Sequence, residues 1–345
     1  MKSKFISLFA SATLLASAIP SASGAPTAEA LRLVGRTEMP TYTGDFDHFG
    51  VDVKGNRLFL AGEDGATLEV FNLRTGAHTK TVKGFDAPHS VLYLPQANRL
   101  VVTDSGEGMT RTLDATTYKF TQPIALVSGA DASRYDPSTK HLWIVTGGKN
   151  AVKKMPNVVV SEVDPATGKH LGDLSFDTDF TEAMAAEQEG NRLFINVAGK
   201  STVAVVDKRT RAVIATWPIK EGEQNGAMAF DEKGRRLFVV TRKPFKLVVL
   251  NSDTGESVVS FDAPKRTNEA IWDAENHRIY LAGDDNLAVF AQRDADHYDE
   301  LALVPSAKGA KTAILVPEIH RLFVAVSPGD ATGGAVLQYA VEPAH

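Results

Sequence analysis

EAMAAEQEGNRLFINV, residues 182–197, and GAMAFDEKGRRLFVV, residues 226–240, are two versions of one repeating pattern. Each version is followed by an apolar run (TVAVVD, then KLVVLN) and by a further β-rich run (RAVIATW, then ESVVSF). Both copies therefore contain four short runs of β-forming residues separated by turn residues. Internal repetition at a period of this length is typical of propellers and solenoids.

The repeat can be counted by the leucine or isoleucine that follows a basic or polar pair in the second run of each copy. These seven anchors are Leu58, Leu100, Leu142, Leu193, Leu237, Ile279 and Leu322. Successive anchors lie 42, 42, 51, 44, 42 and 43 residues apart, the length of four short strands with their turns. The sequence predicts an all-β fold, a seven-bladed β-propeller with four-stranded antiparallel blades. The single longer gap places an insertion in blade 3, around residues 149–156.

The two ends of the chain are expected to share the last blade. AVLQYAV, residues 335–341, reads as the third strand of blade 7, and no fourth strand follows it. LRLVGRTEM, residues 31–39, is a strand without earlier partners. We expect this N-terminal strand to close the last blade as its outer strand, since that pairing leaves no open edge. The alternative, six blades and a loose hairpin, leaves both edges unpaired.

The first residues do not fit the repeat. Lys2 and Lys4 precede an apolar run at 5–19, and small residues follow at 22–24. This order is typical of a cleaved signal peptide, with a retained membrane anchor as the alternative. We expect residues 1–24 to be removed and residues 25–345 to form a single propeller domain, in a periplasmic or secreted protein.

Composition narrows the partners of the mature protein. The 345-residue chain is 43% hydrophobic and contains no cysteine, which excludes disulfides, thiolate metal sites and cysteine nucleophiles. Without Lys2 and Lys4 it has 35 basic and 42 acidic residues, a net charge of −7. A mildly acidic protein is a poor generic partner for nucleic acid or an anionic membrane. We expect a monomer without a membrane span in its mature chain, and a small-molecule or peptide ligand.

The anchors with their aromatic and valine neighbours, Asp-x-x-Thr-Gly turns such as residues 164–168, and fourth strands such as AVIATWP at 212–218 resemble the YncE-like (YVTN-repeat) seven-bladed propellers. The likeness covers about residues 31–342. The literal Tyr-Val-Thr-Asn motif is absent, and LVVTD at 100–104 is among its closest forms. The resemblance implies the fold, whereas propellers of this kind include binding scaffolds, lactonases, lyases and dehydrogenase subunits.

In a propeller the first strand of each blade lines the central channel, so the residues that enter these strands converge on one mouth. Counting eleven residues back from each anchor gives Asp47, His89, Asp131, Glu182, Gly226, Asn268 and Lys311. The next positions include His48, Ser90, Glu269 and Thr312, and Asn225 precedes Gly226. In six of the seven blades, the counted position or the position after it carries an ionisable residue, which we expect near the axis.

Carboxylates and imidazoles that converge from several blades suit a divalent ion such as Ca²⁺, Zn²⁺ or Mn²⁺. The candidate metal ligands are Asp47, His89, Asp131, Glu182 and Glu269. His89, Asn225 and Asn268 are the candidate contacts of a small-molecule ligand. The plainer interpretation is a water-filled channel with polar lining, in which the acids cap strands or pair with Lys311.

Two functions fit such a mouth. The first is an exported binding propeller that holds a small molecule, a metal or a peptide. The second is a metal-dependent hydrolase of the lactonase type, or a lyase, with His48 as base and Lys311 as the cation that stabilises an oxyanion. Propeller lactonases bind their metal with little histidine, so this residue set departs from their pattern. The sequence alone does not choose between an enzyme and a binding protein.

Overall fold

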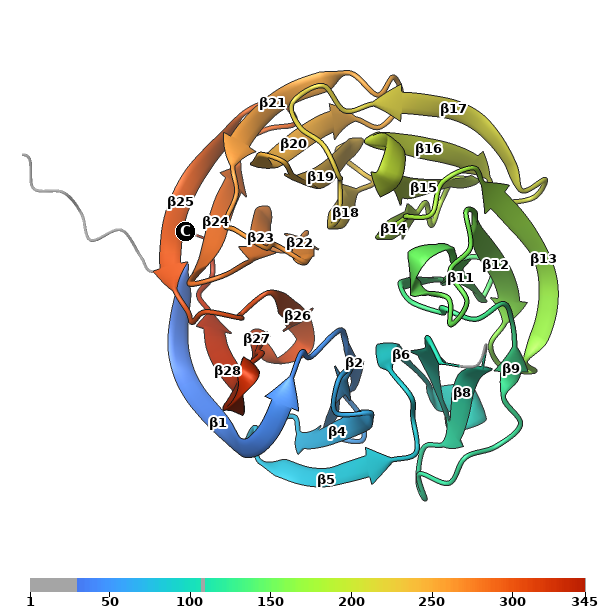
Figure 1. The fold of residues 1–345 in the computed structure, drawn as a ribbon. Helices are drawn as coiled ribbons and strands as arrows, with labels where there is room; N and C mark the ends of the chain where they lie inside the picture. Colours follow the sequence, from blue (N-terminus) through green and yellow to red (C-terminus); the bar gives the residue numbers. More distant parts are fainter. Residues whose placement is uncertain (1–29, 107–108, 345) are drawn as a thin grey trace, which may run out of the picture.

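The computed structural model describes residues 30–106 and 109–344 as seven four-stranded sheets arranged around a central axis (Figure 1). The predicted signal peptide, residues 1–24, lies outside the described residues. Beside the strands, the described part contains four short 3-10 helices: η1 (Pro95–Ala97), η2 (Gly148–Asn150), η3 (Ala198–Lys200) and η4 (Pro317–Ile319). None of the described helices is long and apolar enough to cross a membrane. The predicted seven-bladed propeller is confirmed.

In blades 1 to 6 the strands follow one another from the axis outward in chain order. Blade 1 consists of β2 (Phe49–Asp52), β3 (Arg57–Gly62), β4 (Thr67–Asn72) and β5 (His78–Lys83). Blade 2 consists of β6 (Pro88–Leu94), β7 (Arg99–Asp104), β8 (Met109–Asp114) and β9 (Ile124–Ala125). Blade 3 consists of β10 (Ser133–Asp136), β11 (His141–Gly147), β12 (Val158–Asp164) and β13 (Lys169–Phe176).

Blades 4 to 7 repeat this arrangement. Blade 4 consists of β14 (Met184–Ala186), β15 (Arg192–Val197), β16 (Thr202–Asp207) and β17 (Ala212–Pro218). Blade 5 consists of β18 (Met228–Asp231), β19 (Arg236–Arg242), β20 (Phe245–Asn251) and β21 (Ser257–Asp262). Blade 6 consists of β22 (Glu269–Asp273), β23 (Arg278–Ala282), β24 (Asn286–Gln292) and β25 (Tyr298–Pro305). Blade 7 consists of β26 (Thr312–Val316), β27 (Arg321–Val326), β28 (Gly329–Val341) and β1 (Leu31–Gly44).

Packing between blades explains the repeated pair of apolar residues in the second strands. All seven anchors lie in those strands and are at most 1% exposed. Seven buried apolar clusters occur among the described residues, one between each pair of neighbouring blades. Leu58 packs toward blade 7, whereas the next residue, Phe59, packs toward blade 2. Because side chains alternate across a strand, one Leu-Phe pair serves both faces of a blade.

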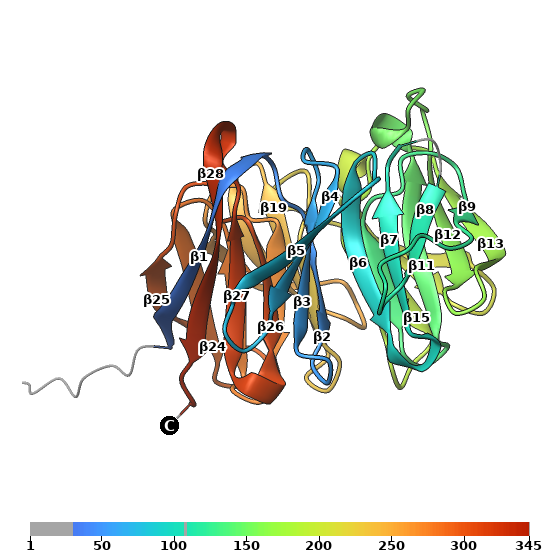
Figure 2. The same ribbon diagram turned by 90° about the horizontal axis from the view of Figure 1, so that it is seen from below.

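The N-terminal strand closes the ring as predicted. β1 pairs antiparallel with β28, with Leu31 opposite Val341 and Met39 opposite Gly334, and Figure 2 shows the two strands side by side. The sheet order β1-β28-β27-β26 gives blade 7 its fourth strand. The predicted insertion in blade 3 is the connection between β11 and β12, residues 148–157, which projects beyond the neighbouring loops (Figure 2).

Candidate functional site

The backbone places one residue from each of five blades at equivalent positions around the axis. Each of these residues donates its N–H to the carbonyl of the residue fourteen positions later, in the second strand of its own blade: Asp47, Asp131, Glu182, Gly226 and Asn268. Adjacent blades are also joined at this level, since the N–H of His48 donates to the carbonyl of His89 at 3.0 Å. Five of the seven positions obtained by counting back from the anchors are therefore structurally equivalent.

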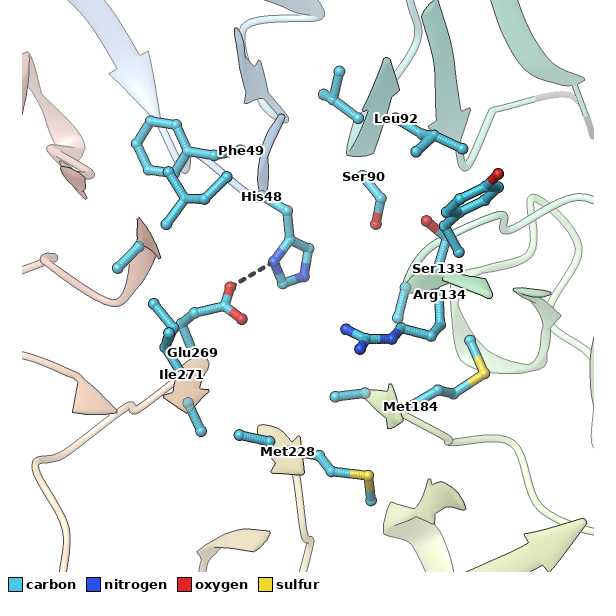
Figure 3. Close-up of a pocket in the computed structure, with 18 of the residues that line it drawn as sticks. His48, Phe49, Ser90, Leu92, Ser133, Arg134, Met184, Met228, Glu269 and Ile271 are labelled. Atoms are coloured by element: carbon cyan, nitrogen blue, oxygen red, sulfur yellow. Dashed lines mark hydrogen bonds and ion pairs between the residues drawn. The ribbon is translucent and has the colours of Figure 1, made fainter. Parts of the chain in front are cut away.

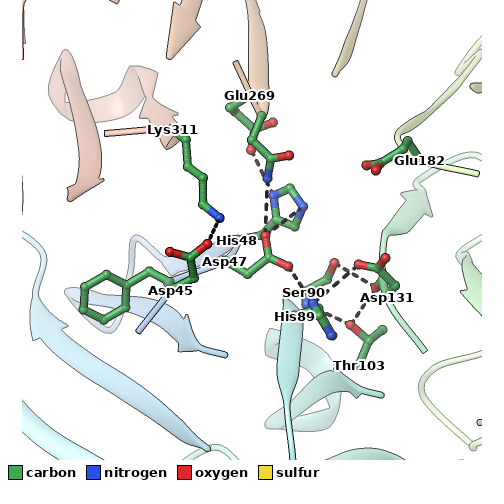
Figure 4. A network of polar contacts seen from close by, with 12 residues as sticks. Asp45, Asp47, His48, His89, Ser90, Thr103, Asp131, Glu182, Glu269 and Lys311 are labelled. Carbon is green, nitrogen blue, oxygen red and sulfur yellow. Dashed lines mark hydrogen bonds and ion pairs between the residues drawn. The ribbon is translucent and has the colours of Figure 1, made fainter. Parts of the chain in front are cut away.

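A hollow of about 410 Å³ lies at this mouth of the channel (Figure 4). It is lined by Asp45, Asp47, His48, Glu63, His89, Ser105, Asp131, Lys149, Asn150, Glu182, Arg242, Asn268 and Lys311. All of these side chains are polar, and they include six of the seven counted positions, without Gly226. The volume is within the range of sites for small molecules.

One side of the hollow, contributed by blades 1 to 3, is an acidic wall formed by Asp47, Glu63, His89 and Asp131. The Nδ1 atom of His89 lies 2.7 Å from Oδ2 of Asp47 and 3.5 Å from Oδ1 of Asp131. The Nδ2 atom of Asn150 donates to Oδ2 of Asp131 at 2.5 Å. Ligand atoms of Asp47, Glu63 and His89 lie within 4.8 Å of one another.

Burial and charge set the protonation of the acidic wall. Burial opposes the charge of His89, but the carboxylates of Asp131 and Asp47 outweigh it and raise the pKa of His89 to about 10. Burial also opposes the charge of Asp47, but His48 and His89 outweigh it and lower the pKa of Asp47 to about 2. For Glu63, burial and then the charge of Asp47 raise the pKa to about 7. At neutral pH the wall thus holds an imidazolium, an ionised Asp47 and a partly protonated Glu63.

Within the acidic wall, the group formed by Asp47, Glu63 and His89 fits a borderline divalent ion. One imidazole and two carboxylates suit Zn²⁺ or Mn²⁺, whereas Ca²⁺ takes oxygen ligands. Of the predicted metal ligands, Asp47 and His89 lie in this group and Asp131 lies beside it. Glu182 and Glu269 are not part of it, because each carboxylate pairs with a cation elsewhere in the channel.

Arg242 occupies the other side of the hollow. Its Nη1 atom donates to Oε1 of Glu182 at 2.7 Å, and its Nη2 atom donates to Oδ1 of Asn268 at 3.2 Å. Burial raises the pKa of the Glu182 carboxyl, and the guanidinium of Arg242 opposes this rise. Glu182 is therefore engaged with blade 5, and Asn268 presents an amide to the hollow from blade 6.

Two lysines complete what we call the basic wall, formed by Lys149, Arg242 and Lys311. The ammonium group of Lys149 lies 3.1 Å from the ring centroid of Phe180, and burial lowers its pKa. Lys311 forms an ion pair with Asp45. The hollow therefore offers both carboxylates and cations, which suits a ligand with both positive and negative groups.

His48 lies between the mouth and the deeper channel. Its Nδ1 atom is 3.0 Å from Oε2 of Glu269, and its Nε2 atom is 3.5 Å from Oδ1 of Asp47. Burial opposes the charge of His48, but Asp47 and Glu269 outweigh it and raise its pKa to about 10. His48 is therefore an imidazolium at neutral pH, whereas the lactonase interpretation requires a base.

Asn225 does not lie at the mouth, contrary to its assignment as a candidate ligand contact. Its side chain is fully buried, and Nδ2 donates to Oδ1 of Asn196 at 2.6 Å and to the carbonyl of Thr202 at 2.9 Å. These partners belong to blade 4, whereas Asn225 precedes the first strand of blade 5. Asn225 therefore joins two blades instead of facing the hollow.

Sequence reasoning missed six residues that also line the hollow: Asp45, Glu63, Ser105, Lys149, Asn150 and Arg242. Glu63, Ser105 and Arg242 share one position in their blades. Glu63 and Ser105 directly follow a second strand and Arg242 is the last residue of one. The second strand runs back toward the mouth, so its end reaches the same face as the entry to the first strand. Each lies five residues after its anchor, so a forward count would have found them. The basic run RKPFK at 242–246, in an acidic protein, instead favours a solvated hairpin loop when only the sequence is considered.

The comparisons with known proteins support the fold alone. The sequence matches no family model and no curated protein. The structure is similar to a chain of hydrazine synthase from Kuenenia stuttgartiensis, with a TM-score of 0.71, 13% identity, and coverage of 88% of this chain and 96% of that one. It is also similar to a chain of the mitotic checkpoint complex, with a TM-score of 0.71, 14% identity, and coverage of 99% of both chains. These likenesses indicate a seven-bladed β-propeller.

Proposed function

We propose that this protein is an exported, monomeric binding propeller of the YncE-like kind, and that its channel mouth binds a divalent ion together with a small polar ligand. Export is inferred from the N-terminal residues 1–24, which have the order of a signal peptide. The YncE-like kinship is inferred from the repeat and turn residues that carry the resemblance.

The observation that carries the proposed ion site is the cluster of ligand atoms from Asp47, Glu63 and His89 within 4.8 Å. Asp47 and Glu63 lie in loops of blade 1 and His89 lies in β6 of blade 2, so the propeller scaffold sets their positions. A cation would stabilise the ionised form of Glu63 most, because the pKa of about 7 for this carboxyl reflects its burial next to the charge of Asp47. An ion would hold the Glu63 carboxylate ionised.

The basic wall supports the proposed second component of the ligand. Lys149, Arg242 and Lys311 face the same hollow as the acidic wall. An anionic group of a small molecule could contact both the ion and one of these cations. A peptide end or a small carboxylic acid has this chemistry.

The proposal is tested with the mature chain, residues 25–345, after dialysis against a chelator. Unfolding is measured in Zn²⁺, Mn²⁺ or Ca²⁺. We expect Zn²⁺ or Mn²⁺ to stabilise the protein by about 2.7 kcal/mol when the free ion is 100-fold above its Kd. The variant Glu63→Gln should not be stabilised by the ion. The control variant Glu275→Gln, which changes an exposed carboxylate in the loop that follows β22, should be stabilised as much as the parent chain. Absence of stabilisation by all three ions, or equal stabilisation of Glu63→Gln, contradicts the ion site.

The hydrolase alternative has weaker support, since His48 is protonated at neutral pH and its ring is held between two carboxylates. The same preparation distinguishes the two functions. Turnover of lactone or ester substrates by the ion-loaded chain, lost in Glu63→Gln, would replace the binding function with the enzymatic one. Binding without turnover supports the proposal made here.

A further inference from the structure

We propose that the channel contains a second ligand site, deeper than the mouth, where Arg134 binds an amphipathic organic anion. A hollow of about 450 Å³ follows the mouth hollow along the channel, and His48 lines both. Its lining comes from the first strands of all seven blades. The volume is within the range of small-molecule sites.

The central feature of this hollow is a guanidinium group without a partner. Arg134 lies in β10, opposite Trp143 of β11, and Figure 3 shows its side chain pointing from blade 3 into the hollow. Among residues 30–106 and 109–344, no hydrogen bond or ion pair joins the guanidinium to another side chain or to the backbone. The side chain is exposed within the open channel, so its guanidinium is accessible to solvent and to a ligand, and it stays charged at physiological pH.

The carboxylates near Arg134 are engaged elsewhere. Glu269 lines the same hollow, but its Oε2 atom is 3.0 Å from Nδ1 of His48. Asp136, two residues along β10, accepts a hydrogen bond from Nζ of Lys208 at 2.9 Å. A planar guanidinium presents two parallel N–H groups that match a carboxylate or a sulfonate. An external anion is therefore the partner that this side chain can accept.

The walls around Arg134 determine the rest of the ligand. Unlike the mouth, the deeper hollow has mostly apolar and aromatic lining residues, among them Leu92, Tyr135, Met184, Met228, Ile271 and Trp272, and polar atoms share the surface that faces it. Methionine side chains adapt to ligands of different shape. A charged group at Arg134 and an aryl or short alkyl body against these walls would satisfy both features. The site therefore favours an organic anion over an inorganic one.

The test uses anilinonaphthalene sulfonate, an aryl sulfonate whose fluorescence rises in apolar surroundings, and phenylnaphthylamine, a similar ring system without the sulfonate. We expect the sulfonate to bind the mature chain at one site. The variant Arg134→Met should weaken this binding about tenfold or more, because a charge-assisted pair is lost. Arg134→Lys should weaken it less. Phenylnaphthylamine should bind weakly and equally to the parent chain and to Arg134→Met.

Two control variants locate the binding. Arg209→Met, which changes an arginine side chain that is 80% exposed, should leave the affinity unchanged. Glu63→Gln, in the mouth, should also leave it unchanged, so that failure of the ion site and failure of this site are distinguishable. On the parent chain alone, octanoate should displace the sulfonate and octanol should not. Equal affinity of Arg134→Met and the parent chain, or displacement by octanol as well as octanoate, overturns the proposal.

Discussion

The Nδ1 atom of His89 lies 2.7 Å from the Oδ2 atom of Asp47, and both side chains are buried in the mouth of the channel. The pKa of His89 is about 10 in the folded protein and about 6.5 in the unfolded chain, so folding favours its imidazolium form. A raised pKa of this kind adds to the free energy of unfolding. The contribution is fully present at pH values below the pKa of the unfolded chain, and it is lost as the pH rises through the pKa of the folded protein.

We therefore expect the free energy of unfolding to fall between pH 7 and pH 10, by on the order of 3 kcal/mol for His89. Urea unfolding of the parent chain and of His89→Gln over this range measures the effect. The difference in stability between the two proteins should shrink as the pH rises. A difference that stays constant from pH 7 to pH 10 would show that the charge of His89 does not stabilise the fold.

Ion binding at the acidic wall should release protons. His89 must lose a proton to act as a ligand, and Glu63, with a pKa of about 7, is partly protonated at neutral pH. We expect Zn²⁺ to release about one to two protons at pH 7, and its affinity to increase from pH 6 to pH 9. Calorimetry in buffers with different heats of ionisation measures the release. His89→Gln should release fewer protons, and binding without any release would contradict the assigned ligands.

The fold is predictable from the sequence because the contacts that build it repeat locally. Leu237 and Phe238 are neighbours in the chain and pack toward blades 4 and 6, so each repeat carries the signal for two interfaces. The candidate site is only partly predictable. Asp47 and His89 can be found by counting back from the anchors, whereas Glu63 reaches the hollow from the loop that follows a second strand. Asn225 precedes the counted position of blade 5 and finds its partners in the neighbouring blade, a contact that spacing along the chain does not encode.

The ammonium group of Lys208 links blades 3 and 4 in the interior. Its Nζ atom lies 2.9 Å from Oδ2 of Asp136, and both side chains are at most 2% exposed. Lys208→Met would leave the buried Asp136 carboxylate without its cation, so we expect a loss of about 3–5 kcal/mol in the free energy of unfolding. Lys200→Met, which removes an exposed pair with Asp177, should change stability by less than about 1 kcal/mol.

The double variant Lys208→Met with Asp136→Leu separates the cost of the stranded charge from the value of the pair. Replacing both members of a buried ion pair by apolar residues is often neutral or stabilising. We expect the double variant to unfold at higher urea than Lys208→Met alone. If it is no more stable than the single variant, the Asp136 carboxylate is not stranded in Lys208→Met, and the hydroxyl groups of Ser138 and Thr139, which donate to it at 2.7 and 2.9 Å, are sufficient partners.

Closure of the ring by β1 can be tested by moving the start of the chain. β1 supplies the outer strand of blade 7, and it buries Leu31, Met39 and Tyr42, each at most 8% exposed. A chain that begins at Ala30 keeps this strand, whereas one that begins at Asp45 leaves β28 with an open edge and uncovers two of the blade interfaces.

Each large apolar side chain that is no longer buried costs about 1.5–3 kcal/mol, so loss of three of them removes much of the stability of an ordinary domain. We expect the chain from Ala30 to be monomeric and as stable as the mature protein. The chain from Asp45 should be destabilised and should associate through the exposed edge of β28, which is detectable by size-exclusion chromatography and thermal unfolding. Equal stability of the two chains would mean that blades 1 to 6 and three strands of blade 7 hold the ring closed without β1.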